Sequence, residues 1–264
     1  MEHRILEQDL PSVTVIMPAY RAREYVETAI RSVMAQTMPE WELIVIDDCS
    51  GDETPEVVHA LSREDDRIRL VRNEENMGVA RTRNKGLDMA RGRYIALLDS
   101  DDVWHPEKLE RQIALLEQEQ ADICYCSYAI IDRKNKRCRG DFLVPDRTDY
   151  NASLVQSVIS CSTILLRRET AGHYRFPENF YHEDLVLWLQ MLADGCRAVG
   201  VRQVLAGYRI VDGSRASNKV RTVWNRWRVY RGLGISRVRS AMLLGRYGIL
   251  ALRKYGARVP RAEG

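Results

Sequence analysis

The sequence predicts an α/β fold in which a mixed, mainly parallel sheet is flanked by helices. Short apolar runs rich in Val, Ile and Leu alternate with segments whose apolar residues recur at helical spacing. This alternation is typical of parallel strands joined by helical crossovers. Apolar residues at successive positions of the runs indicate strands that are buried on both faces. With 264 residues, the chain can hold one large domain and an appendage.

The first half of the chain contains four expected strands, each followed by a helical pattern. A β-branched run stops at Pro18, and Gly92 stops the helix that Gly78 opens. Glycine is common where helices end, and β-branched residues favour strands. The expected strands are 13–17, 41–46, 68–71 and 94–98, and the expected helices are 26–33, 54–61, 78–90 and one that begins at 106–107.

The second half adds three strands, at 123–131, 163–166 and 203–210, and a basic turn at 134–136. Apolar residues recur at i, i+3, i+4 and i+7 from Leu185 to Leu192, which predicts a helix. The last part predicts two helices broken at 232–234. We therefore expect a catalytic domain over 1–218 and a basic helical tail over 219–264.

The apolar run from Tyr94 to Leu98 ends abruptly in Asp99-Ser100-Asp101-Asp102. Carboxylates this close raise one another's pKa unless a cation lies among them. Asp oxygens suit Mg²⁺ or Mn²⁺, which takes its remaining ligands from water and substrate phosphates. The motif therefore predicts a metal–diphosphate site at Asp99 and Asp101. The alternative is that these acids only form a turn and cap the helix that begins near Pro106.

Two further expected strands end in polar residues, Pro18-Ala19-Tyr20 and Asp47-Asp48. Ligands of parallel α/β sheets bind at the carboxyl ends of the strands. The loop at 19–23 has no glycine, so neither a GxGxxG nor a GxxxxGK phosphate loop is present. A nucleotide held through a metal fits better, with Asp47 or Asp48 accepting from base or ribose, Tyr20 flanking the base and Arg81 nearby. Each residue also has a structural explanation, as a turn residue, rim packing or a solvated helix face.

Four motifs in order resemble the signature of the family 2 glycosyltransferases. They are Val-Ile-Met-Pro-Ala-Tyr at 15–20, Val-Ile-Asp-Asp-Cys-Ser at 45–50, Asn-Met-Gly-Val-Ala-Arg at 76–81 and Leu-Leu-Asp-Ser-Asp-Asp at 97–102. The resemblance spans roughly residues 12–210. It implies a GT-A fold, an inverting mechanism, a nucleotide-sugar donor that is usually UDP-linked, and Mg²⁺ or Mn²⁺ held by the Asp-x-Asp.

The resemblance also assigns roles to individual residues. Asp48 and Tyr20 would lie at the base, Asp99 near the ribose and the metal, and Asp101 on the metal. Cys49 departs from the pattern because the family usually has glycine there. The other residues expected at the donor are Pro18, Ala19, Asp47, Arg81, Ser100 and Arg209.

Glu183 and Asp184 precede the apolar helix that starts at Leu185. Acids at a helix start compensate the helix dipole, and position alone favours that explanation. The resemblance instead identifies them as the family's catalytic pair, in which Asp184 removes the proton of the acceptor hydroxyl. His182 is an alternative base, since its unperturbed pKa suits general-base work.

Arg209 ends an expected strand and precedes a Gly- and Ser-containing loop at 212–217. A cation there would meet the leaving diphosphate as the loop closes. The alternative is a surface loop that ends the domain. Members of the resembled family have a Tyr-Arg here, which Tyr208-Arg209 matches.

The formal charge of +3 is divided unevenly along the chain. Residues 219–264 contain twelve Lys or Arg and one acid, Glu263, while 28 basic and 36 acidic residues precede them, so the tail is about +11 and the body about −8. Basic residues beside aromatics suit an anionic membrane surface and would equally suit nucleic acid. A glycosyltransferase of the resembled kind commonly extends a lipid-linked glycan on the inner membrane face, which favours the membrane. The stretch at 227–231 resembles the tails of bacterial teichuronic-acid and capsule transferases. A hairpin that packs on the body is the alternative.

The cysteines form no CxxC pair, the first twelve residues are polar, and no run approaches the ~20 apolar residues of a membrane span. We therefore expect a cytoplasmic enzyme attached peripherally to the inner face of the cell membrane, with no nucleic-acid partner. Its acceptor would be a lipid-linked or growing surface polysaccharide. The alternatives are a sugar-phosphate nucleotidyltransferase and a non-catalytic membrane- or nucleic-acid-binding protein on a degenerate fold.

Overall fold

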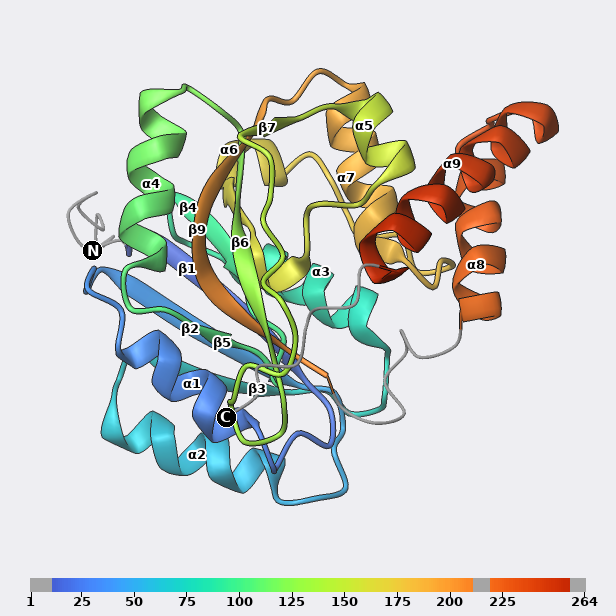
Figure 1. Cartoon of the computed structure of the whole chain (residues 1–264). Coiled ribbons are helices and arrows are strands. Elements are labelled where there is room, and N and C mark those ends of the chain that lie inside the picture. Colours follow the sequence, from blue (N-terminus) through green and yellow to red (C-terminus); the bar gives the residue numbers. More distant parts are fainter. Residues whose placement is uncertain (1–10, 211–218, 257–264) are drawn as a thin grey trace, which may run out of the picture.

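The computed structural model describes residues 11–210 and 219–256, and a nine-stranded sheet forms its centre (Figure 1). The strands are β1 (Val13–Ala19), β2 (Trp41–Asp47), β3 (Ile68–Arg72), β4 (Tyr94–Leu97), β5 (Val103–Trp104), β6 (Ile123–Ile131), β7 (Arg147–Thr148), β8 (Leu165–Arg167) and β9 (Ala198–Arg209). Their order is β3-β2-β1-β4-β8-β6-β9-β5, and β7 pairs with β9.

The first four large strands are parallel, as the sequence predicts. β1 lies between β2 and β4, and β3 lies beyond β2. Ala19 is opposite Asp47, and Ile16 is opposite Leu97. The carboxyl ends of β1, β2 and β4 therefore meet at one edge, where the motif residues were expected.

The other half makes the sheet mixed. β8 runs antiparallel to both β4 and β6, whereas β6 and β9 are parallel and β5 runs antiparallel to β9. Strand β9 begins five residues before the expected 203, because its first part pairs along β6. The two-residue strands β5 and β7 are too short to produce a periodic pattern, and the sequence did not predict them.

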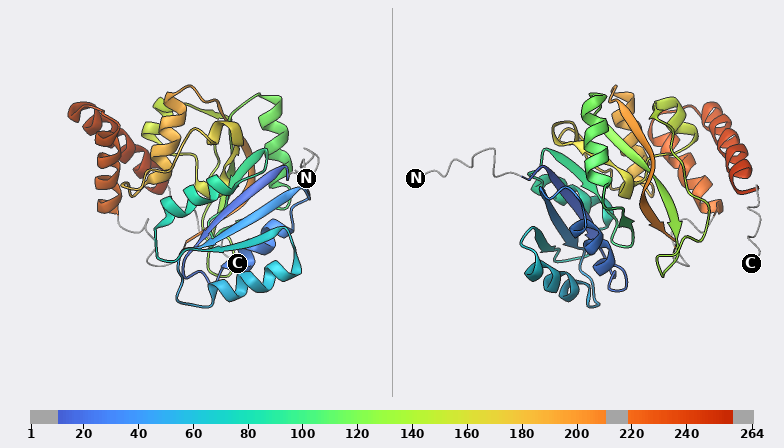
Figure 2. Two further views of the ribbon diagram at one scale, coloured as in Figure 1. Left: turned by 180° about the vertical axis from the view of Figure 1, so that it is seen from behind. Right: turned by 60° about the vertical axis from the view of Figure 1, so that its left-hand side comes forward.

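Helices cover both faces of the sheet (Figures 1 and 2). The apolar sides of α1, α2 and α4 pack on one face with β1 and β2, and α3 and α7 pack on the other. The short α5 and α6 were not predicted. The helices are α1 (Val26–Met34), α2 (Thr54–Glu64), α3 (Val79–Met89), α4 (Lys108–Gln118), α5 (Tyr150–Val155), α6 (Arg168–Ala171), α7 (Glu183–Ala193), α8 (Lys219–Gly232) and α9 (Arg237–Gly256).

The basic tail forms a helical hairpin beside α7 and α5 (Figure 2). Its break at 232–234 is confirmed, since α8 ends at Gly232 and α9 begins at Arg237. Tyr230 and Val229 are buried in one cluster with Leu185 and Leu189 of α7, so the alternative of a hairpin that packs on the body holds. In the described part of the tail and body, no helix has the length and apolar character to cross a bilayer. The expected loop at 212–217 lies outside the described residues.

Candidate active site

The loop from Asp99 to Asp102 joins β4 to β5 and is held from two sides. The backbone N–H of Asp99 donates to Ser162 Oγ at 3.0 Å, and the indole of Trp104 donates to the Ser162 carbonyl at 2.7 Å. From the other side, the backbone N–H of Arg209 donates to Asp102 Oδ1 at 2.8 Å. Ser162, which precedes β8, and Arg209, at the end of β9, thus fix this loop. Each of them is more than 60 residues away from the loop in sequence.

Arg83, which sequence reasoning missed, connects the acidic loop to the helix that carries the expected base. Its guanidinium lies 2.6 Å from Asp99 Oδ1 and 2.8 Å from Glu183 Oε1. The side chains of Arg83 and Glu183 are almost fully buried, while that of Asp99 is 30% exposed. Because Glu183 is tied to Asp99 through one residue, its neighbour Asp184 is held beside the acidic loop.

Burial and crowding disfavour the charged form of the carboxylates in the acidic loop. Burial, and then the Asp99 charge, raises the pKa of Asp101 to about 6. Burial likewise raises the pKa of Asp102, with help from Asp101 and Asp99. Within the described residues there is no cluster of three or more potential metal ligands. Asp99 and Asp101 carry the carboxylate oxygens that Mg²⁺ and Mn²⁺ prefer, and a metal ion held by these two residues stays a prediction.

The carboxylates of Asp47 and Asp48 accept hydrogen bonds from neighbouring loops at the edge of the sheet. Asp48 accepts the backbone N–H groups of Met77 and Gly78 at 2.9 and 2.8 Å, together with the Asn73 amide at 2.8 Å. Asp47 is fully buried and accepts the Ser50 N–H at 3.2 Å. Both carboxylates thus hold loops, and a contact of either with a base stays a prediction.

Tyr20, expected at the base, follows β1, and Pro18 and Ala19, expected at the donor, end that strand. Tyr20 is 45% exposed, and the guanidinium of Arg21 lies over its ring. Ala19, which follows Pro18 in β1, gives its carbonyl to the Asp48 N–H at 2.8 Å. Cys49 has φ 60°, the left-handed conformation that favours the glycine usual in the family. Cys49 therefore adopts a backbone conformation that a glycine would adopt more easily.

The two expected arginines, Arg81 and Arg209, contact other protein groups in the structure. Arg81 is half-exposed and pairs with Glu178 at 2.6 Å. Arg209 is buried, and its donors reach the carbonyls of Asp101 and Asp132 at 2.5 and 2.7 Å and Asn135 Oδ1 at 2.5 Å. In the structure Arg209 therefore braces the backbone of the acidic loop, and its contact with a leaving diphosphate stays a prediction.

Asp184 stands in the first turn of α7 and is partly exposed. Its Oδ1 accepts the Leu185 N–H at 2.7 Å, so it satisfies a backbone donor at the helix start as a dipole-compensating acid would. His182 is the residue before the helix, its side chain makes no capping bond, and its ring lies against Tyr181. Both candidate bases are thus at one end of α7.

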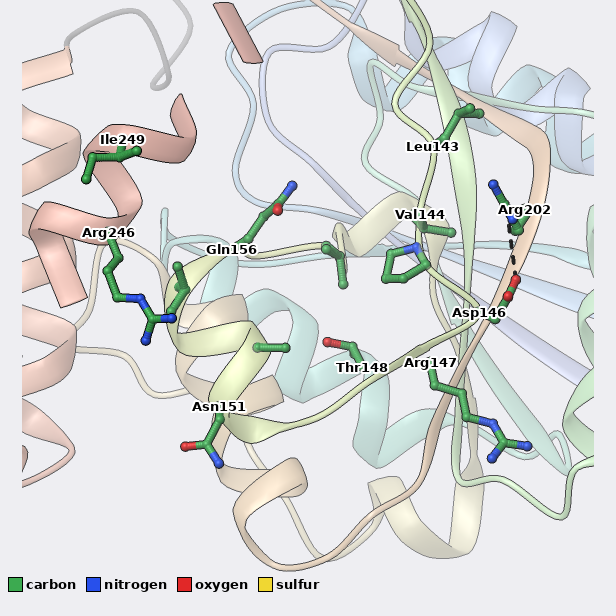
Figure 3. Close-up of a pocket in the computed structure, with 14 residues that line it drawn as sticks. Leu143, Val144, Asp146, Arg147, Thr148, Asn151, Gln156, Arg202, Arg246 and Ile249 are labelled. Atoms are coloured by element: carbon green, nitrogen blue, oxygen red, sulfur yellow. Dashed lines mark ion pairs between the residues drawn. The ribbon is translucent and has the colours of Figure 1, made fainter. Parts of the chain in front are cut away.

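A pocket of about 1070 Å³ lies away from these acids (Figure 3). It lies between α5, the segment at 143–148 and α9, which contributes Arg246 and Ile249. Arg202, which faces Asp146 in this pocket, precedes Arg209 by seven residues along β9, roughly 20 Å. None of the expected site residues lines this pocket.

A smaller pocket of about 640 Å³ lies next to the start of α7. The segment at 179–180 forms one wall and α8 forms the other. Phe180 is four residues before Asp184, so their Cα atoms lie within about 15 Å.

Comparisons with known proteins agree with this architecture. The profile of Glycosyl transferase family 2 matches residues 14–175. TuaG of Bacillus subtilis (strain 168), a glycosyltransferase assigned to teichuronic acid biosynthesis, is 38% identical over 84% of this chain and 88% of its own. WfgD of Escherichia coli is named a UDP-Glc:α-D-GlcNAc-diphosphoundecaprenol β-1,3-glucosyltransferase. It is 36% identical over 92% of this chain and 94% of its own.

Solved structures share the fold. TarS 1–349 of S. aureus in complex with UDP-GlcNAc has a TM-score of 0.71 at 21% identity and covers 93% of this chain and 74% of its own. The mannosyltransferase PcManGT of Pyrobaculum calidifontis, solved with GDP-Man and Mn²⁺, has a TM-score of 0.69 at 18% identity. The match covers 95% of this chain and 76% of that of PcManGT. The expected GT-A fold is confirmed. The family profile matches most of the sheet, and TuaG is 38% identical over 84% of this chain. This chain therefore belongs to glycosyl transferase family 2 and is a glycosyltransferase.

Proposed function

We propose that this glycosyltransferase moves a sugar from a UDP-linked donor to a hydroxyl of a lipid-linked or growing surface polysaccharide, with inversion at the anomeric carbon. Family membership favours this reaction over the two alternatives, a nucleotidyltransferase and a non-catalytic binding protein. The observation that carries the proposal is the ion-pair chain from Asp99 through Arg83 to Glu183, because it joins the donor loop to the helix of the base.

Asp184 is the proposed base. The acceptor oxygen attacks the anomeric carbon as its proton passes to the Asp184 carboxylate, and the bond from that carbon to the diphosphate breaks with its electron pair leaving on the nucleotide. Attack opposite the leaving group inverts the configuration. Partial exposure of Asp184 at the helix start leaves its carboxylate accessible to a hydroxyl.

Asp99 and Asp101 are the proposed metal ligands. A bound Mg²⁺ or Mn²⁺ would neutralise the donor's diphosphate and stabilise the leaving group. The raised pKa of Asp101 supports a cation here. Burial and the Asp99 charge disfavour the ionised form of Asp101, and a neighbouring positive charge would stabilise that form. Arg209 then acts on the loop backbone by holding the Asp101 carbonyl. Asp47, Asp48, Tyr20 and Arg81 remain the proposed surroundings of the nucleotide.

The α8–α9 hairpin is the proposed contact with the inner face of the cell membrane. Val238, Met242 and Ile249 are 71%, 60% and 54% exposed and fall on one stripe of α9. With the tail's charge of about +11, such a stripe suits an anionic surface. Vesicles of anionic lipid should sediment the protein at low salt, and a Val238→Ser/Met242→Ser variant should sediment less. Equal sedimentation with neutral vesicles would contradict electrostatic docking.

The donor is tested by thermal unfolding with a panel of nucleotide sugars, each with Mn²⁺ or with chelator. A UDP-sugar should stabilise the protein only with the metal. Product configuration by NMR then tests inversion. His182→Gln separates the two bases, since it should retain transfer while Asp184→Asn loses it. Loss of transfer in His182→Gln alone would assign the base to His182.

A further inference from the structure

The pocket beside the start of α7 has a wall built from one face of α8. Trp224, Trp227, Arg228 and Arg231 line it, and their spacing of i, i+3, i+4 and i+7 places them on one side of the helix. The adjacent stripe of α8, which includes Val229 and Tyr230, is buried against α7. Burial of that stripe fixes the rotation of α8, so the pocket face has a defined orientation.

The opposite wall is the segment that leads to the expected base. Phe180 packs against Gly232 so closely that a Cβ at Gly232 would lie 2.4 Å from the Phe180 ring. Only a glycine lets the ring lie there. The chain continues from Phe180 to Glu183, which Arg83 holds. The pocket, α8 and the base are therefore one connected unit.

The chemistry of the lining selects an anion with an apolar part. Among the described residues, the pocket is lined by two arginines and no acid. Arg228 and Arg231 are three residues apart on a helix, so their Cβ atoms are about 5–6 Å apart. Two arginines whose side chains start this close together can both reach one diphosphate, and guanidinium groups bind phosphates bidentately. The rings of Trp224, Trp227 and Phe180 offer apolar faces next to them.

We propose that this pocket binds the diphosphate and first isoprene units of an isoprenoid-diphosphate-linked acceptor; this rests on the proposed function for the role of Asp184. Arg228 and Arg231 contact the phosphates, and the tryptophans contact the isoprenoid. The sugar attached to that diphosphate then extends along 180–184 towards the base. The donor's diphosphate belongs to the acidic loop, on the other side of Arg83 and Glu183.

Geranyl diphosphate is the probe, and chelator keeps it from binding through a metal at Asp99 and Asp101. Binding to the full chain is followed by calorimetry. Arg228→Gln should weaken it by about 10- to 100-fold, the effect of losing a hydrogen bond to a charged group. Arg228→Lys should recover only part of it. Arg228 carries the test because Arg231 also donates to the Ile235 carbonyl in the turn to α9.

Matched variants separate the pocket from general basic charge. Arg237→Gln and Arg239→Gln remove the same charge from exposed positions of α9 and should leave binding within about twofold. Trp224→Ala should weaken geranyl diphosphate while inorganic diphosphate binds as before. If Arg237→Gln weakens binding as much as Arg228→Gln does, or if Arg228→Gln has no effect, the pocket assignment is overturned.

Two further arms identify the source and separate the two proposals. If an anionic phospholipid is the true ligand, vesicle sedimentation should depend on Arg228, whereas binding of geranyl diphosphate should not. That result also overturns the assignment. Excess UDP should not displace the probe. Stabilisation by a UDP-sugar with Mn²⁺ is measured on the same Arg228→Gln protein. If that stabilisation fails in every variant while the probe binds through Arg228, the proposed function fails and the pocket stands.

Discussion

Replacing Arg83 with Met should destabilise the protein more than any other single exchange at the site. The exchange removes the Arg83 guanidinium from the Glu183 carboxylate, which is 8% exposed, and from Asp99. Breaking a buried ion pair from one side costs about 3–5 kcal/mol, because the remaining charge is uncompensated. Glu183→Gln alone should cost less, since Arg83 keeps its 2.6 Å contact with Asp99.

The double variant Arg83→Met/Glu183→Gln distinguishes an uncompensated charge from a simple loss of packing. Removing the buried charge should restore about 1–3 kcal/mol relative to Arg83→Met, as expected of residues in direct contact. The free energies come from urea unfolding followed by tryptophan fluorescence, compared at equal m-values. Arg81→Met is the matched control, because the Arg81–Glu178 pair is about half-exposed and should contribute at most about 1 kcal/mol.

Two results would refute the bridge. One is an Arg83→Met protein that loses less than about 1 kcal/mol, similar to Arg81→Met. The other is a double variant no more stable than Arg83→Met. If the bridge also orients the base, the folded double variant should still transfer sugar poorly, which a purely structural pair would not cause.

Four further exchanges test other parts of the description. Asp101→Ala, or chelator, should remove most affinity for a nucleotide sugar by calorimetry, and undiminished turnover in EDTA would contradict the metal site. Asp184→Asn should lower transfer by about 10²–10⁴-fold with donor affinity within a few-fold; a change in stability alone would leave only the helix-start role. Burial lowers the pKa of Lys108 from 10.5 to about 8. Between these two pH values the folded state binds fewer protons than the unfolded chain, so the contribution of Lys108 to stability rises with pH. The stability advantage of Lys108→Met over the parent should therefore shrink between pH 7 and 10, and a constant difference would show that Lys108 titrates normally. Tyr230→Ala, at a fully buried ring, should lower the free energy of unfolding by about 3–5 kcal/mol, while exposed Trp224→Ala should change it little; equal effects would mean that the hairpin is not part of the core.

Much of the fold was predictable because burial on both faces leaves a continuous apolar signal. The runs that became β1, β2 and β4 carry it, and the motif residues at their ends follow from strand direction alone. The pairing of β8 between β4 and β6 was not predictable, since three residues hold no register information.

Arg83 was missed because Arg81 and Arg83 look alike in sequence. Two residues along a helix turn the side chain by roughly 200°, so one arginine faces solvent and the other faces the core. The polar sequence of α3 gives no indication of which side is buried. The partners of Arg209 were not predictable for a related reason, because Asp101, Asp132 and Asn135 come together only through tertiary structure.

The way Ser162 and Arg209 hold the acidic loop has a consequence for synthesis of the protein. Both residues leave the ribosome long after Asp99, and β4 cannot pair on its second side until β8 has emerged. The parallel strands β1 to β4 are complete in the nascent chain while the acidic loop still lacks its restraints. Contacts of such sequence separation slow folding. We expect a nascent chain that ends before β9 to form most of the nucleotide edge without a competent metal site, so that donor binding begins only when nearly the whole catalytic region has been made.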